Sequence, residues 1–250
     1  MKKAFGKAPL LELLEKIGDA LDGSVTVYLI GGGAMAFRNQ KDETKDLDLV
    51  FTSNRDCQRF SKVLPGLGFE SKQVLEKAYE KMDATGGIWE GSGPRLDLFV
   101  KTVCKALSLS ASMEARGTLL GTFGKLRVIM LSNEDIILLK AITERPDDSD
   151  DIARIVTSVG VDWEVILQEC VSQSGERQWF GPVLDKLNEL RDKHGISAPI
   201  TREIEELDEL SVIRDAYRRR LEKGLSKEKA IGELRKLGFT QKELKQAKLG

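Results

Sequence analysis

Apolar residues recur along the chain with two different spacings, and the spacing separates predicted helices from predicted strands. Residues 9–21 repeat apolar residues at the helical period, with Pro9 in the expected first turn. The apolar face of this helix consists of Leu10, Leu13, Leu14, Ile17 and Leu21. Glu12, Glu15 and Lys16 interrupt the stretch, so it lacks the continuous hydrophobic region of a secretory signal peptide.

Four short segments have the composition of strands. They cover residues 25–30, 46–51, 95–100 and 126–130. The first is rich in β-branched residues and leads into a glycine turn at 31–33. A short helix at 34–38 and a polar loop at 39–45 are expected to follow it. The segment at 46–51 alternates acidic and apolar residues, which predicts a strand with one buried face.

Helices are predicted between and after these strands. Residues 54–64 form one helix with Asn54 as its cap, and Ser132 caps another that continues to Ile142. Two helices at 148–159 and 162–173 come next, and the last fifty residues are helical throughout. The predicted helices in this last part cover 203–223, 226–237 and 240–248. Gly86 and Gly87 are read as a hairpin turn.

The charge of the chain is unevenly distributed. Of the 250 residues, 41% are hydrophobic and 32% charged, which is typical of a soluble globular protein, and the net charge is −1. Residues 211–250 hold 12 basic and 5 acidic residues, a net charge of +7, whereas residues 1–210 carry −8. The densest basic cluster is Arg218, Arg219 and Arg220. This basic tail modestly favours a nucleic-acid partner, since lysine and arginine release counterions from phosphates.

Cysteine and histidine usage narrows the chemistry. Cys57, Cys104 and Cys170 are odd in number and show no short metal-ligand spacing, so reduced thiols in a cytoplasmic protein are expected. His194 is the single histidine, at what looks like a helix end, and this excludes a histidine-rich metal site. No apolar run is long enough to span a bilayer.

The candidate chemistry is a set of glycines and acids in a fixed order. A strand leads to Gly31 and Gly32, the pair Asp46 and Asp48 lies on the next strand, and Asp97 stands between apolar neighbours on a later one. Residues two apart on a strand point to the same face, so Asp46 and Asp48 present two carboxylates together. A neighbouring strand can add Asp97. Three converging carboxylates repel one another and need a compensating cation, and Mg²⁺ or Mn²⁺ prefers oxygen ligands.

In this order and spacing the residues resemble the DNA polymerase β-like nucleotidyltransferase superfamily. The likeness rests on Ile30-Gly31-Gly32, Asp46-Leu47-Asp48-Leu49 and Leu96-Asp97-Leu98, and it covers roughly residues 25–156. A closer likeness is to abortive-infection type toxin nucleotidyltransferases, through Gly31 to Ala34, Thr44 to Leu49, and Leu139-Lys140-Ala141 with Arg145, Pro146, Asp148, Asp151 and Ile152. The fold class it implies is α+β, with a small mixed sheet flanked by helices and a helical C-terminal region.

The resemblance also implies roles for individual residues. Asp46 and Asp48 would hold two metal ions, and Asp97 would bind the catalytic one and help to activate the acceptor hydroxyl. The residues implied in nucleotide binding are Gly31, Gly32, Gly33 and Lys140, with Arg38, Thr44 and Lys45 flanking the site. Arg145, Asp148 and Asp151 have an equally good structural explanation, an ionic lock between two helices. No nucleophilic side chain is expected, because the acceptor hydroxyl itself attacks.

The resulting prediction is a metal-dependent enzyme with three parts. Residues 1–145 form the nucleotidyltransferase core, 146–200 a helical extension packed on it, and 201–250 a basic helical appendage. The enzyme transfers a nucleoside monophosphate from a nucleoside triphosphate such as ATP to RNA, in particular a tRNA end, or to a protein hydroxyl, and releases pyrophosphate.

Two other functions stay open at this point. One is a non-catalytic nucleotide sensor on the same fold, which magnesium-dependent release of pyrophosphate would exclude. The other is a toxin–antitoxin interaction protein whose tail docks a partner protein, against which salt-dependent RNA binding would argue. The docking face would be Ala230, Ile231, Leu234 and Leu237, although packing within the chain is the more usual use of such a face.

Overall fold

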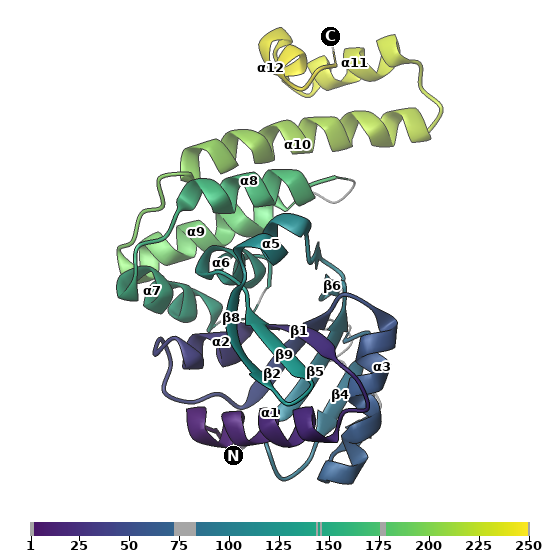
Figure 1. Cartoon of the computed structure of the whole chain (residues 1–250). Coiled ribbons are helices and arrows are strands. Elements are labelled where there is room, and N and C mark those ends of the chain that lie inside the picture. Colours follow the sequence, from purple (N-terminus) through teal and green to yellow (C-terminus); the bar gives the residue numbers. More distant parts are fainter. Residues whose placement is uncertain (1–2, 73–83, 144, 146, 176–178, 250) are drawn as a thin grey trace. The chain divides into compact units, whose positions relative to one another are not determined.

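The computed structural model of the chain describes residues 3–72, 84–143, 145, 147–175 and 179–249. It divides into two compact units, Met1–Asp162 and Trp163–Gly250 (Figure 1). The predicted division at residues 145 and 200 stays a prediction. No helix in the described part of the chain combines the length and apolar character needed to cross a membrane.

The first unit is built on a mixed sheet, which confirms the predicted α+β class. Its strands are β1 Val25–Ile30, β2 Asp46–Phe51, β3 Glu70–Lys72, β4 Gly87–Glu90, β5 Arg95–Val100, β8 Thr118–Phe123 and β9 Leu126–Met130. They lie in the order β3-β4-β5-β2-β1-β9-β8 (Figure 1). The pairs β2–β5 and β1–β9 are parallel and β1–β2 is antiparallel. A separate two-stranded ribbon pairs β6 Thr102–Val103 with β7 Leu107–Ser108.

Helices flank this sheet on both sides (Figure 1). The helical elements of this unit are α1 Lys7–Ala20, α2 Gly31–Phe37, α3 Asn54–Val63, η1 Pro65–Leu67, α5 Ala111–Arg116, α6 Asn133–Ala141 and α7 Asp148–Ser158. The predicted apolar face of α1 is buried as expected. The Phe51 ring of β2 meets the Phe60 ring of α3 edge to face, with centroids 5.2 Å apart. Because side chains alternate along a strand, Asp46 and Asp48 project from the face opposite to Phe51.

Two predicted helix starts are wrong. Helix α2 begins at Gly31, not at residue 34, so the glycines belong to its first turn. Ser53 rather than Asn54 caps α3, because its hydroxyl accepts a hydrogen bond from the Asp56 backbone N–H. The predicted cap at Ser132 is confirmed, since its hydroxyl accepts from the Asp135 N–H.

The second unit consists of helices in the described residues. These are α8 Trp163–Gln173, α9 Phe180–His194, α10 Thr201–Glu222, α11 Lys227–Lys236 and α12 Gln241–Gln246. Of α9, the sequence pattern indicated only the end, where Gly195 adopts a left-handed conformation with φ of +68°. His194 is half-buried there.

The C-terminal helices have a small core of their own. Ile213 of α10, Leu234 of α11, and Leu244 and Ala247 at α12 are buried against one another. This packing uses most of the apolar face considered for docking a partner, because Ala230 and Leu234 are both fully buried. Leu237, by contrast, is 63% exposed.

This core predicts a contrast between two leucines of one helical turn. Leu234→Ala should lower the free energy of unfolding of the second unit by about 2–5 kcal/mol, because it removes buried methyl groups and leaves a cavity. Leu237→Ala is the matched control and should change it by less than about 0.5 kcal/mol. Urea denaturation of the full chain, followed by circular dichroism, measures both. Equal effects of the two substitutions would contradict this core.

Candidate active site

Three carboxylates meet at the centre of the sheet. In the parallel pair β2–β5, Asp48 lies opposite Asp97, and Asp46 lies opposite Arg95. The side chain of Asp97 is completely buried, whereas those of Asp46 and Asp48 are partly exposed. The structure therefore brings together the three acids that the sequence pattern selected, from strands separated by some fifty residues of chain.

An arginine that sequence reasoning missed lies between two of these acids. Nη2 of Arg95 donates to Oδ2 of Asp46 at 2.9 Å and to Oδ2 of Asp97 at 2.6 Å. The Arg95 side chain is only 14% exposed. The sequence feature that could have identified Arg95 is its position two residues before Asp97 on the same strand, which places both side chains on one face.

The electrostatics of the acids reflect their crowding. Burial, together with the charges of Asp46 and Asp97, raises the pKa of Asp48 well above its usual value. Burial also raises the pKa of Asp97, although the Arg95 guanidinium acts in the opposite direction. The positive charge of Arg145 favours the ionised form of both acids. The crowded acids therefore resist ionisation, and a further cation beside them would favour their ionised forms.

The first two glycines of α2 make room for the polar side chains beside them. Gly31 has a φ of +60°, and a Cβ there would lie 2.4 Å from Oδ2 of Asp48. A Cβ on Gly32 would lie 2.8 Å from Oγ1 of Thr44. Only glycine allows this close approach in the left-handed conformation at position 31. Gly33 differs, because a Cβ there would meet the apolar side chains of Leu47 and Leu29.

A cavity of about 520 Å³ opens beside the carboxylates. Asp46 and Asp48 line it, and so do Gly31, Gly32, Thr44, Lys45, Lys140 and Arg145. Two residues predicted for nucleotide binding are not among its lining, Gly33 and Arg38. The Arg38 guanidinium instead donates to the backbone carbonyl of Leu131, and burial lowers its pKa.

Backbone and side-chain hydrogen bonds both hold Thr44 in place, two residues before the start of β2. Its backbone pairs with that of Phe5 in an isolated antiparallel bridge, with N···O distances of 2.8 and 3.0 Å. Its hydroxyl donates to the backbone carbonyl of Asp46 at 3.0 Å. Thr44 is 4% exposed and contacts the residue that begins the acidic strand, so it positions Asp46.

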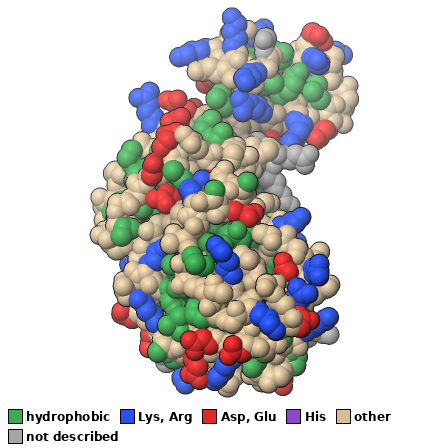
Figure 2. Space-filling model, viewed as in Figure 1, with side chains coloured by type: hydrophobic (Ala, Val, Ile, Leu, Met, Phe, Trp, Pro, Cys, Tyr) green, Lys and Arg blue, Asp and Glu red, His purple; other side chains and the backbone are tan. Residues whose placement is uncertain are grey.

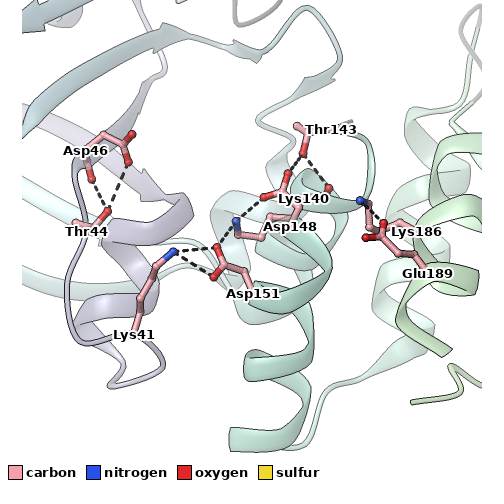
Figure 3. Close-up of polar contacts among 9 residues, drawn as sticks. All are labelled: Lys41, Thr44, Asp46, Lys140, Thr143, Asp148, Asp151, Lys186 and Glu189. Carbon is pink, nitrogen blue, oxygen red and sulfur yellow. Dashed lines mark hydrogen bonds and ion pairs between the residues drawn. The ribbon is translucent and has the colours of Figure 1, made fainter. Parts of the chain in front are cut away.

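A second charged network lines the cavity (Figure 3). Nζ of Lys140 on α6 contacts Oδ1 of Asp148 and Oδ2 of Asp151 on α7, both at 2.8 Å. Lys41, which sequence reasoning missed, reaches Asp151 at 3.1 Å from the loop before β2. The hydroxyl of Thr143 donates to Asp148.

This network supplies the predicted ionic lock between two helices, with Lys140 as its basic partner. Burial alone would lower the pKa of Lys140, but Asp148 and Asp151 outweigh it and raise this pKa. Burial alone would raise the pKa of Asp151, but the ammonium groups of Lys140 and Lys41 lower it. Pro146, which belongs to the predicted pattern, lies outside the described residues.

The comparison with protein families places the chain in one of them. A family described as nucleotidyltransferase of unknown function (DUF6036) matches residues 8–181. The chain belongs to this family and is therefore a nucleotidyltransferase, which confirms the predicted enzyme class. A comparison with curated proteins gives no match. The closer likeness to toxin enzymes stays a prediction.

The glycine at the start of α2 yields a first prediction for the site. Gly31→Ala should lower the free energy of unfolding by at least about 1–2 kcal/mol, because the left-handed conformation is unfavourable with a Cβ and the methyl group would meet Asp48. Gly66→Ala is the matched control, since a Cβ there has no neighbour within 4 Å. Thermal denaturation measures both variants. A wild-type melting curve for Gly31→Ala would contradict the tight contact.

The charged network predicts a dependence of stability on pH. Asp151 has a lower pKa in the folded chain than its ordinary value of 3.8, so its ionised form stabilises the fold above that pH. This contribution is lost as the pH falls through the folded pKa. The difference in unfolding free energy between the wild type and Asp151→Asn should therefore be constant above about pH 5 and shrink below about pH 4. Urea denaturation across this range tests it, and a difference independent of pH would contradict the pairing.

Proposed function

We propose that this chain transfers a nucleoside monophosphate from a nucleoside triphosphate to an acceptor hydroxyl and releases pyrophosphate, with Mg²⁺ or Mn²⁺ held by Asp46, Asp48 and Asp97. The observation that carries the proposal is the meeting of these three carboxylates on β2 and β5, beside a cavity. Membership of a nucleotidyltransferase family supports the reaction class.

The residues present suit a divalent cation in kind and in charge. Oδ1 of Asp97 is buried and has no hydrogen-bond partner among the described residues, so one ligand position is open. Carboxylate oxygens are the ligands that Mg²⁺ prefers. In the described part of the chain, no three acidic, cysteine or histidine side chains form a ready metal cluster. Arg95 stands between Asp46 and Asp97 in this arrangement.

The chain's own groups divide the work of the transfer. When bound, the metal would neutralise charge on the phosphates and on the attacking oxygen. The bond from the acceptor oxygen to the α-phosphorus forms while the bond from that phosphorus to the bridging oxygen breaks. Asp97, as the proposed ligand of the metal beside the acceptor oxygen, would take the hydroxyl proton. Lys140, on the wall of the cavity, would contact the phosphates.

Lys140 and its neighbours fit a triphosphate by charge. Lys140, Lys45 and Arg145 line the same cavity as the carboxylates. Two ammonium groups, those of Lys41 and Lys140, share the single carboxylate of Asp151. A phosphate oxygen entering here would find a lysine whose position is already fixed, so little side-chain entropy is lost on binding.

For the acceptor we propose RNA bound through the C-terminal helices. Lys and Arg side chains are prominent on these helices in the face drawn in Figure 2. Arg219 is exposed, whereas Arg218 pairs with Asp215 at 2.9 Å and Arg220 with Glu233 at 3.0 Å. Exposed pairs of this kind are weak and can exchange for phosphate contacts. A protein hydroxyl is the second candidate acceptor.

The proposal predicts that label transfer depends on the acids of β2. The purified chain is incubated with Mg²⁺ or Mn²⁺, each α-labelled nucleoside triphosphate in turn, and either total RNA or cell-lysate protein. Asp46→Asn and Asp48→Asn should each lower the rate of transfer by at least about a hundredfold, because each removes charge that organises the reacting groups. Glu15→Gln, at an exposed acid of α1, is the matched control and should keep the wild-type rate.

The label also identifies the substrates. The triphosphate that gives a labelled product names the nucleotide, and the size of that product separates RNA from protein. Transfer to RNA should weaken as salt rises, and more slowly in Arg219→Gln, because fewer counterions are released. Full transfer by Asp46→Asn, or none by the wild type with any triphosphate, would overturn the proposal.

A further inference from the structure

Arg95 occupies the position that two of the proposed metal ligands share. Its Nη2 atom lies 2.6 Å from Oδ2 of Asp97 and 2.9 Å from Oδ2 of Asp46. Asp46 of β2 is the register partner of Arg95 on β5, and Asp97 lies two residues after Arg95 on the same strand, opposite Asp48. A single nitrogen thus joins two strands through two carboxylates, and it does so at the centre of the candidate site.

We propose that Arg95 is a resident cation that holds Asp46 and Asp97 together in the metal-free enzyme and competes with the divalent metal for them. This inference rests on the proposed function, because it concerns the same carboxylates. Metal binding then requires the guanidinium to leave its place between the two acids. Arg95 is a positioning residue in this scheme and takes no part in the chemical step.

The competition follows from charge and distance. A guanidinium keeps its charge at every pH at which proteins fold, so Arg95 cannot lose its proton to make way for a metal ion. Mg²⁺ binds carboxylate oxygens at about 2.0–2.1 Å, and a cation bound to the same oxygens would lie close to Nη2. Two cations at such a separation repel strongly in a partly buried site. The metal ion can therefore bind these oxygens only if the Arg95 guanidinium moves away from them.

The surroundings explain why an arginine is needed when no metal is bound. Asp97 is wholly buried and Arg95 is 14% exposed, so little solvent screens the acids from one another. Without a cation between them, Asp46 and Asp97 would repel across the β2–β5 pair. Oδ1 of Asp97 keeps no partner among the described residues and offers an incoming metal a first ligand that Arg95 does not occupy.

The test measures the affinity of the full chain for Mn²⁺ alone, by the electron paramagnetic resonance signal of the free ion. Arg95→Met should bind Mn²⁺ at least about tenfold more tightly than the wild type, because the competing cation is gone. Lys45→Met is the matched control: it likewise removes one positive charge next to Asp46, but Lys45 is exposed and lines the cavity. Its gain should be at most a few-fold.

A second readout needs no metal binding. In EDTA, Arg95→Met should melt at a lower temperature than Lys45→Met, because Asp46 and Asp97 lose the group that bridges them, and added Mn²⁺ should reverse this loss. Arg95→Gln keeps a donor without the charge and replaces Arg95→Met if that variant does not fold. Equal Mn²⁺ affinities for Arg95→Met or Arg95→Gln and Lys45→Met would overturn the inference.

Asp97→Asn separates this inference from the proposed function. If it binds Mn²⁺ as the wild type does, the metal site itself is wrong and both proposals fail. If it loses Mn²⁺ while the Arg95 variant matches Lys45→Met, the metal site stands and only the role of Arg95 is wrong.

Discussion

Three carboxylates that crowd together at the centre of the sheet, where burial and neighbouring acids raise the pKa of Asp48 and Asp97, constrain the residues around them. Asp48 and Asp97 face each other across a parallel strand pair, and Asp46 stands two residues before Asp48 on the same face. Nothing about a sheet requires acids at its centre, so the neighbouring elements have to accommodate them. The Arg95 guanidinium joins two of the acids, and the missing side chain of Gly31 leaves space for the third.

In the second charged network, nearby charges shift the pKa of an acid in the opposite direction. Burial and neighbouring carboxylates raise the pKa of Asp48 and of Asp97. Asp151 contacts two lysines and its pKa falls, although one of them, Lys140, also contacts Asp148. Residues of both clusters line one cavity. The metal-bound nucleoside triphosphate proposed above would meet the first cluster with its metal and the second with its phosphates.

Elements with a local pattern of apolar and polar residues could be predicted from the sequence. The partners toward which individual side chains point could not. The acid–apolar alternation at 46–51 gave the bounds of β2, and the lone acid between apolar residues placed Asp97 on β5. Arg38 is near the site in sequence, yet its side chain donates to Leu131. Lys41 was missed because its partner Asp151 lies 110 residues away, a separation that no local period records. The bond from Arg95 to Asp46 spans 49 residues and was equally hidden, although the spacing of Arg95 from Asp97 was a local signal. Helix α2 begins at glycines, which are poor helix formers by propensity.

The side chains paired between β2 and β5 also disfavour a shifted register of these two strands. Leu98 pairs with Leu49, on the side of the sheet where Phe51 meets Phe60 of α3. A slip of β5 by one residue would turn Asp97 into that apolar layer and Leu98 toward the acids. The misfolded sheet would then contain an isolated buried charge and would lose the ion pair of Arg95 with both acids. The residues proposed for catalysis therefore also contribute to folding, because they make the shifted register of β5 less stable than the native one.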